Sequence, residues 1–160
     1  MPLQGTAAAR FLGETVFKHI LIPTDGSPLS ERAAMGAAQL ASALSARLTA
    51  ISVSVPFHLF AMGRAKLADT EETYRKNCEK RASGHLDAVR QVAKAAGVFF
   101  DAMHVYAEQP YAAIIEAADE RDCDAICMAS HGHKGLAALV LGSETVQVLT
   151  HSTIPVVVWR

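Results

Sequence analysis

Residues 18–28 read KHILIPTDGSP, a short apolar run that leads through a turn into a candidate helix. The run over residues 18–23 is continuous rather than alternating, as is typical of strands buried on both faces of a parallel sheet. Ser27 is a good helix N-cap, and Pro28 suits the first helical position. This stretch therefore predicts a β-strand that passes directly into an α-helix.

The same strand-and-helix unit repeats along the chain. Further strands are predicted at residues 47–55, 98–106, 125–129 and 155–159. Helices are predicted from residue 28, with an apolar face that reaches Leu44, at about 69–96, at 110 to about 120, and from about 143 to a point before Ile154. Residues 56–68 have no clear hydrophobic period, and we expect a mobile flap there. The alternation predicts an α/β fold: a doubly wound, five-stranded, mostly parallel, Rossmann-like sheet with helices on both faces.

One domain accounts for the length of the chain, 160 residues. We expect residues 17–160 to form this domain. Residues 1–16 contain no apolar segment of the signal-peptide kind, so we expect a loose tail there. The three cysteines are an odd number, which argues against a disulfide framework and favours a cytoplasmic location.

The charge balance limits the classes of partner. Fifteen basic and sixteen acidic residues leave a formal charge of −1, so the attraction of a basic domain to nucleic acid or anionic lipid is absent. No apolar run reaches the roughly 18 residues that a membrane span needs. We therefore expect neither a nucleic acid nor a membrane as partner.

The predicted topology indicates where a small ligand would bind. In open parallel sheets, ligands bind beyond the carboxyl ends of the strands. The segments at these ends are residues 23–26, 53–56 and 106–109, and the loop that starts at Ala129.

The loop over residues 129–143 reads ASHGHKGLAALVLGS and leads into the last helix. Gly132 and Gly142 can adopt positive φ and let a ligand approach the backbone N–H groups closely. With the helix N-terminus and the Ser143 hydroxyl, these groups would form a site suited to phosphates, and His133 adds charge beside it. The alternative is that the glycines serve turns and that the last pair is a helix start with a good N-cap.

Three segments of the chain resemble a known family. They are ILIPTDGS at residues 20–27, MASHG at residues 128–132 and LGSETVQVLTHSTIPVVV at residues 141–158. All three look like the corresponding segments of the universal stress protein family, and the resemblance extends over residues 17–160. Neither a Walker A motif nor a G-x-G-x-x-G motif after the first strand accompanies them.

The resemblance includes a nucleotide-binding motif. Nucleotide-binding members of the family carry G-x2-G-x9-G-[ST], and Ala129, Gly132, Gly142 and Ser143 occupy those positions with the same spacing. Only the first glycine is replaced. The resemblance implies that ATP or another adenine nucleotide binds here, with Mg²⁺ as a candidate companion, and that the glycines and the serine contact its phosphates.

The resemblance also implies an adenine and ribose pocket. It would be lined by Pro23, Thr24 and Asp25 after the first strand and by Val53 after the second. Asp25 has a second interpretation, because Asp-Gly-Ser-Pro is a good turn and cap sequence in which the carboxylate bonds nearby backbone.

The last strand, from Pro155 to Trp159, is apolar and lies at the end of the printed sequence. An exposed edge of this kind is usually covered or paired. The resemblance implies a homodimer formed by antiparallel pairing of this strand, whereas burial within the monomer is the simpler alternative.

Two residues weigh against ATP. Ala129 would cost about 1 kcal/mol if its position required positive φ, and almost nothing if it simply ends a strand. Glu144 places a carboxylate in the first turn of the last helix, where it would compete with phosphates for the helix dipole. Lys134 or a divalent cation could offset that charge. The rival to an ATP-binding stress protein is therefore a nucleotide-free dimeric interaction module, and a third hypothesis is an enzyme for another small substrate.

Other chemistry is weakly indicated. His131 and His133 form an H-x-H pair without a third ligand, so no metal site is predicted. Cys127 lies in an apolar strand and is interpreted as a small buried hydrophobe rather than a redox partner of Cys123. No set of nucleophile, base and orienting group can be identified, and we expect any ATP hydrolysis to be slow.

Overall fold

The computed structural model describes residues 15–62, 70–132 and 141–160, in which strands and helices alternate. The strands are β1 (His19–Pro23), β2 (Arg47–Ser54), β3 (Phe100–Tyr106), β4 (Ala125–Ala129) and β5 (Val156–Trp159). The helices are α2 (Pro28–Leu44), α3 (Phe57–Met62), α4 (Glu71–Ala95), α5 (Pro110–Glu120) and α6 (Ser143–His151). The predicted N-terminal tail lies outside the described residues, except for Thr15 and Val16, which belong to no helix or strand.

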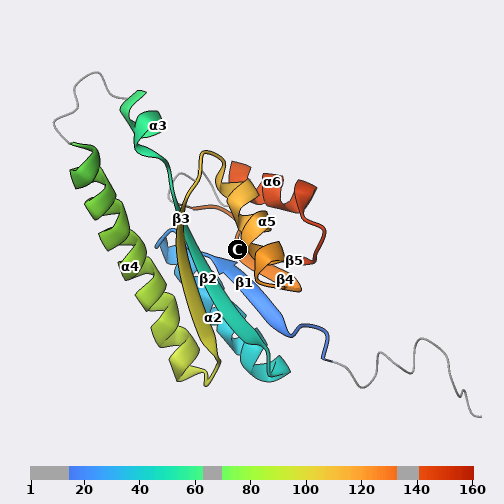
Figure 1. Cartoon of the computed structure of the whole chain (residues 1–160). Helices are drawn as coiled ribbons and strands as arrows, with labels where there is room; N and C mark the ends of the chain where they lie inside the picture. The colour runs from blue at the N-terminus through green and yellow to red at the C-terminus, as the bar shows by residue number, and fades with distance from the viewer. Residues whose placement is uncertain (1–14, 63–69, 133–140) are drawn as a thin grey trace, which may run out of the picture.

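The strands form one sheet in the order β3-β2-β1-β4-β5, and each neighbouring pair is parallel. From β1 at the centre the chain moves outward to β3, then crosses back to β4 and continues to β5 (Figure 1). The predicted α/β fold with a doubly wound five-stranded sheet is confirmed, and the sheet is parallel throughout.

Helices cover both faces of the sheet, because side chains along each strand alternate between them. Ile20 and Ile22 of β1 pack in one core with α2 and α4. Leu21, between them, packs in a second core with α5 and α6. Figure 1 shows α4 on the opposite side of the sheet from α5 and α6. The near-continuous apolar character of the strands thus reflects burial on both faces.

The helix ends follow the local signals in the sequence. Ser27 caps α2 by accepting a hydrogen bond from the Ser30 N–H at 3.2 Å, and Pro28 is the first residue of that helix. Gly97, with φ +68°, directly follows Ala96, the C-cap of α4. These caps confirm the predicted start of α2 and end of α4.

Part of the predicted flap at residues 56–68 is helical. Residues 57–62 form α3, and Phe60 stacks on Tyr74 of α4 with ring centroids 4.4 Å apart. The Tyr74 hydroxyl also donates a hydrogen bond to the Val55 carbonyl at 2.7 Å. Contact with α4 stabilises this short helix, and a periodicity search along the segment alone does not detect such a contact. Residues 63–68 of the predicted flap lie outside the described residues.

Trp159 at the end of β5 packs against a glycine of α2. A Cβ atom built on Gly36 would overlap the Trp159 indole ring. The indole N–H donates to the Sγ atom of Cys127 at 2.8 Å, so the ring is held between β4 and the helix. Burial raises the pKa of the Cys127 thiol to about 11, which keeps that thiol protonated. Gly36 thus permits the close approach of α2 to β5.

Gly36 and Gly84 provide a matched pair of substitutions. Gly36→Ala should destabilise the protein by on the order of 1–3 kcal/mol, because the rigid indole must move. Gly84 lies within α4 with open space around the Cβ position, so Gly84→Ala should stabilise by about 0.5–1 kcal/mol. Urea unfolding followed by the fluorescence of the single tryptophan measures both changes. Equal effects of the two substitutions would contradict the packing described for Trp159.

His19 is a buried histidine at the start of β1. Its side chain is 6% exposed, and its Nε2 atom lies 2.7 Å from the Thr49 hydroxyl. Burial, with a smaller contribution from the charge of Arg47, lowers the pKa of His19 below its ordinary value of 6.5. The unfolded chain therefore binds a proton at a higher pH than the folded protein does.

This difference predicts a loss of stability on acidification. As pH falls through about 6.5, the unfolded state takes up the His19 proton first, so the free energy of unfolding decreases by up to about 1.4 kcal/mol per pH unit. His19→Gln keeps a polar group beside Thr49 but does not titrate. Thermal unfolding between pH 7.5 and 5.5 should show a larger fall in Tm for the wild type than for the variant. Parallel curves for the two proteins would show that His19 does not carry this effect.

Candidate functional site

The sheet has its topological switch point between β1 and β4. The helix that follows β1 covers one face of the sheet, and the helix that follows β4 covers the other. The chain therefore diverges beyond the carboxyl ends of these two strands, as Figure 1 shows. This is the place where the sequence predicts a ligand.

A cleft of about 230 Å³ lies at this point. Its described lining comes from the carboxyl ends of β1, β2 and β4 and the residues that follow β1 and β4, from the first turns of α2 and α6, and from one side of α5. The residues that line it are Pro23, Thr24, Asp25, Ser30, Ile51, Val53, Pro110, Ile114, Met128, Ala129, His131, Gly132, Glu144 and Thr145.

The cleft brings together predicted residues from four separate segments of the chain. They are Pro23, Thr24, Asp25, Val53, Ala129, Gly132 and Glu144. Gly142 and Ser143 lie next to Glu144 but do not line the cleft. His133 and Lys134 lie outside the described residues. All the residues predicted for the base and ribose therefore line the cleft, whereas Gly142 and Ser143, predicted for the phosphates, do not.

Asp25 makes the turn contact considered from the sequence and also lines the cleft. Its Oδ1 atom accepts a hydrogen bond from the Ser27 N–H at 2.9 Å, which orders the turn before α2. The carboxylate also lines the cleft, where a Cβ atom on Gly132 would overlap its Oδ2 atom. The turn and the binding interpretations are therefore compatible.

The glycines of the loop do not have the backbone conformation that the sequence predicts. Neither Gly132 nor Gly142 has a positive φ, and the φ of Gly142 is −64°. Their small size matters instead. Gly132 lies against the Asp25 carboxylate, and a Cβ atom on Gly142 would be 3.2 Å from the Cα atom of His131. The absence of a side chain, rather than an unusual backbone conformation, explains both glycines.

Ala129 is the last residue of β4, is 8% exposed and has no positive φ. Ala129 replaces the first glycine of the family motif. Because it simply ends a strand, this replacement costs almost nothing. The Thr145 hydroxyl stabilises the end of β4, because it lies within hydrogen-bond distance of the Ala129 carbonyl (3.0 Å) and the Ser130 carbonyl (3.1 Å). The start of α6 is thereby attached to the end of β4.

Hydrogen bonds hold both ends of the loop between β4 and α6. The Ser130 N–H donates to the Trp159 carbonyl, and the Gly142 N–H donates to the Ser130 carbonyl, each at 2.7 Å. Gly142, and not Ser143, is the N-cap of α6, and it has no side chain to make a capping bond. The pair is a helix start, as the alternative interpretation expected, with glycine in place of a hydroxyl side chain at the N-cap.

Glu144 interacts with a second helix as well as with its own. It lies in the first turn of α6, where the sequence predicts an interaction with the dipole of that helix. In the structure its Oε2 atom accepts a hydrogen bond from the Tyr111 N–H, in the first turn of α5, at 2.8 Å. Gln109, the N-cap of α5, makes no side-chain capping bond, so Glu144 supplies that acceptor. The carboxylate is thus fixed between the two helix N-termini and lines the cleft.

Several lining residues are absent from the sequence prediction. They are Ser30, Ile51, Pro110, Ile114, Met128, His131 and Thr145. Ile51 and Met128 could have been found from their place near the carboxyl ends of predicted strands. Pro110 and Ile114 could not, because their contribution depends on how α5 packs over the second core.

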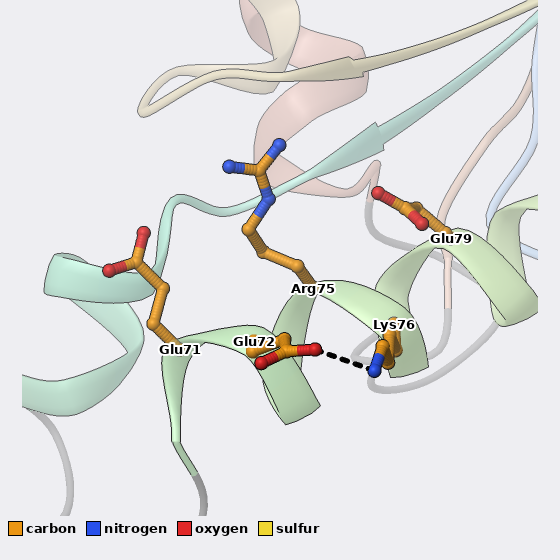
Figure 2. Close-up of a pocket in the computed structure, with 5 residues that line it drawn as sticks. All are labelled: Glu71, Glu72, Arg75, Lys76 and Glu79. Carbon is orange, nitrogen blue, oxygen red and sulfur yellow. Dashed lines mark hydrogen bonds and ion pairs between the residues drawn. The ribbon is translucent and has the colours of Figure 1, made fainter.

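A second hollow lies on the outer face of α4 and is lined by Glu71, Glu72, Arg75, Lys76 and Glu79 (Figure 2). Glu72 and Lys76 form an ion pair of 2.6 Å, with side chains 77% and 72% exposed. All five side chains come from one helix, and no strand end contributes. This hollow is a solvated charged face, so the cleft at the switch point remains the candidate site.

Within the described ranges, no three His, Cys, Asp or Glu side chains come together as metal ligands would. None of the helices in these ranges combines the length and the apolar character that a membrane crossing requires.

The fold and the cleft define a doubly wound α/β protein with a small-molecule crevice at its switch point. The family model described as "Universal stress protein family" matches residues 17–160, and the chain belongs to this family.

Among individual relatives, the universal stress protein MJ0531 of Methanocaldococcus jannaschii is 29% identical over 148 residues, which cover 91% of this chain and 84% of the relative. The universal stress protein UspA from Lactobacillus plantarum is similar in structure, with a TM-score of 0.72 and 24% identity over 89% of this chain and 97% of that one.

Two similar structures contain nucleotides. A universal stress protein in complex with cAMP has a TM-score of 0.63 and 25% identity, covering 89% of this chain and 95% of that one. The universal stress protein from Archaeoglobus fulgidus in complex with dAMP has a TM-score of 0.65 and 18% identity, covering 91% of this chain and 99% of that one.

Proposed function

We propose that this protein is a cytoplasmic stress-response protein that binds an adenine nucleotide in the cleft and changes its interactions with partners accordingly. The observation that carries the proposal is the convergence of Asp25, Val53 and Gly132, predicted from separate segments, on one cleft at the switch point. The cAMP and dAMP complexes of two similar proteins support the choice of an adenine compound.

The lining suggests a role for each part of the cleft. The apolar side chains of Ile51, Val53 and Met128 would pack against the base, and the Asp25 carboxylate would accept hydrogen bonds from the ribose. Gly132 leaves space between the Asp25 carboxylate and the loop. Gly142 and Ser143, at the start of α6, are the groups proposed for phosphate contact. In this proposal Mg²⁺ accompanies ATP, and any hydrolysis is slow.

The rival function is a nucleotide-free interaction module with the same fold. The observation that favours it is the Glu144 carboxylate, which lies in the cleft and is held there by the Tyr111 N–H. The two functions differ in a single measurable property, the affinity for adenine compounds.

Calorimetry separates them. Purified protein should bind at least one of adenosine, AMP and ATP with Mg²⁺ with a Kd below about 100 μM. Gly132→Ala should weaken binding at least tenfold, because the new methyl group displaces the Asp25 carboxylate. Gly84→Ala, the same substitution in open space on α4, should leave the affinity unchanged. Absence of binding by all three compounds would favour the nucleotide-free module.

The proposal includes a homodimer formed through the outer edge of β5. Within the described sheet, β5 pairs on one side only, with β4. The carbonyls of Pro155 and Trp159 accept hydrogen bonds from β4 and the residue after it, so the period of two turns the peptide groups of Val156 and Val158 outward. An edge with outward N–H and C=O groups can pair with a second copy.

Val158→Pro tests this edge. Proline removes the outward N–H and is tolerated on edge strands, so the substitution should shift the protein toward the monomer in light scattering after size-exclusion chromatography. Val158→Thr keeps the N–H and should not change the mass. A monomeric wild type, or a Val158→Pro variant that stays dimeric, would refute pairing through β5.

A further inference from the structure

Glu144 is fixed in the cleft from two directions. Its carboxylate accepts the Tyr111 N–H of α5 at 2.8 Å. Its neighbour Thr145 is 2% exposed and bonded through its hydroxyl to the end of β4. If the carboxylate swung out of the cleft, the Tyr111 N–H would lose its acceptor, since Gln109 provides no capping bond for α5. The negative charge is therefore part of the site.

The charge of Glu144 changes what two helix N-termini can offer a ligand. Each N-terminus is equivalent to about half a positive charge, which ordinarily attracts phosphate. Glu144 lies in the first turn of α6 and is bonded to the first turn of α5. One full negative charge thus offsets the positive ends of both helices, and their attraction for a phosphate group is largely cancelled.

The rest of the described lining adds a second carboxylate, that of Asp25, and one basic side chain, the imidazole of His131. Among the described residues that line the cleft there is no lysine or arginine. Glu144 takes part in none of the ion pairs found between described residues. Like charges at short range in a partly buried site repel strongly, so each phosphate charge added to a ligand opposes binding.

The hydrogen-bonding character of the lining favours the same class of ligand. Ionised carboxylates accept hydrogen bonds and donate none, so they favour ligands rich in hydroxyl or amino groups. A neutral nucleoside meets this requirement better than a triphosphate does.

We propose that Glu144 makes the cleft select adenine compounds by their phosphate charge, so that adenosine binds best, AMP next and ATP least. This inference rests on the proposed adenine binding and specifies which ligands the site takes.

Calorimetric titration of the full chain with adenosine, AMP and ATP, each with and without Mg²⁺, tests the inference. In the wild type ATP should bind at least tenfold more weakly than adenosine. Glu144→Gln removes the charge but keeps an oxygen for the Tyr111 N–H, so it should tighten ATP at least fivefold and change adenosine less than twofold. Glu116→Gln, on an exposed position of α5 outside the cleft, makes the same charge change and should alter neither.

The outcomes separate the two proposals. ATP binding as tightly as adenosine in the wild type would overturn the selection by charge and would leave adenine binding intact. An unchanged ratio of ATP to adenosine affinity in Glu144→Gln would also overturn it. Absence of binding by all three compounds, with both variants folded by circular dichroism, would overturn the proposed function and the inference with it.

Discussion

β1 and β4 pair in parallel through Ile20 with Ala125 and Leu21 with Ile126, and the position of the site depends on this short pairing. It joins two halves of the chain whose helices lie on opposite faces of the sheet. The turn after β1 and the loop after β4 therefore leave the sheet side by side, and Gly132 comes to lie against Asp25. Without this pairing, the segments that resemble a nucleotide site would have no common location.

The parts of the fold that the sequence predicts correctly depend on local patterns. Continuous apolar runs mark strands buried on both faces, and Ser27 with Pro28 marks the start of α2. α3 was not predicted because it is stabilised by a stacking contact between Phe60 and Tyr74, 14 residues further along the chain. Such a contact depends on tertiary packing, which no window of the sequence contains.

In the site, too, the sequence predicts the local features but not the contacts that depend on tertiary packing. The predicted order of strands and helices indicates which segments meet, and the resemblance implies the ligand class. The conformations of Gly132 and Gly142 were predicted wrongly. A glycine can be required because the backbone has a positive φ or because a side chain would not fit, and the sequence alone does not distinguish these two reasons. Glu144 lies in the first turn of its own helix as expected, but its hydrogen-bond donor is the N–H of Tyr111, 33 residues away. The sequence pattern around Glu144 does not show that the carboxylate also reaches the N-terminus of a second helix.

Two backbone hydrogen bonds connect β5 with the start of α6, beside the cleft. The Trp159 carbonyl accepts from Ser130, and the Ser130 carbonyl accepts from Gly142, at the N-terminus of α6. A ligand that displaced the Ser130 peptide would therefore act on the hydrogen bond to the end of β5. By thermodynamic linkage, a contact made at this edge that favours one position of the peptide changes the ligand's affinity by the same factor by which the ligand changes the contact. Pairing of two copies and binding of the ligand would then depend on the same conformational equilibrium.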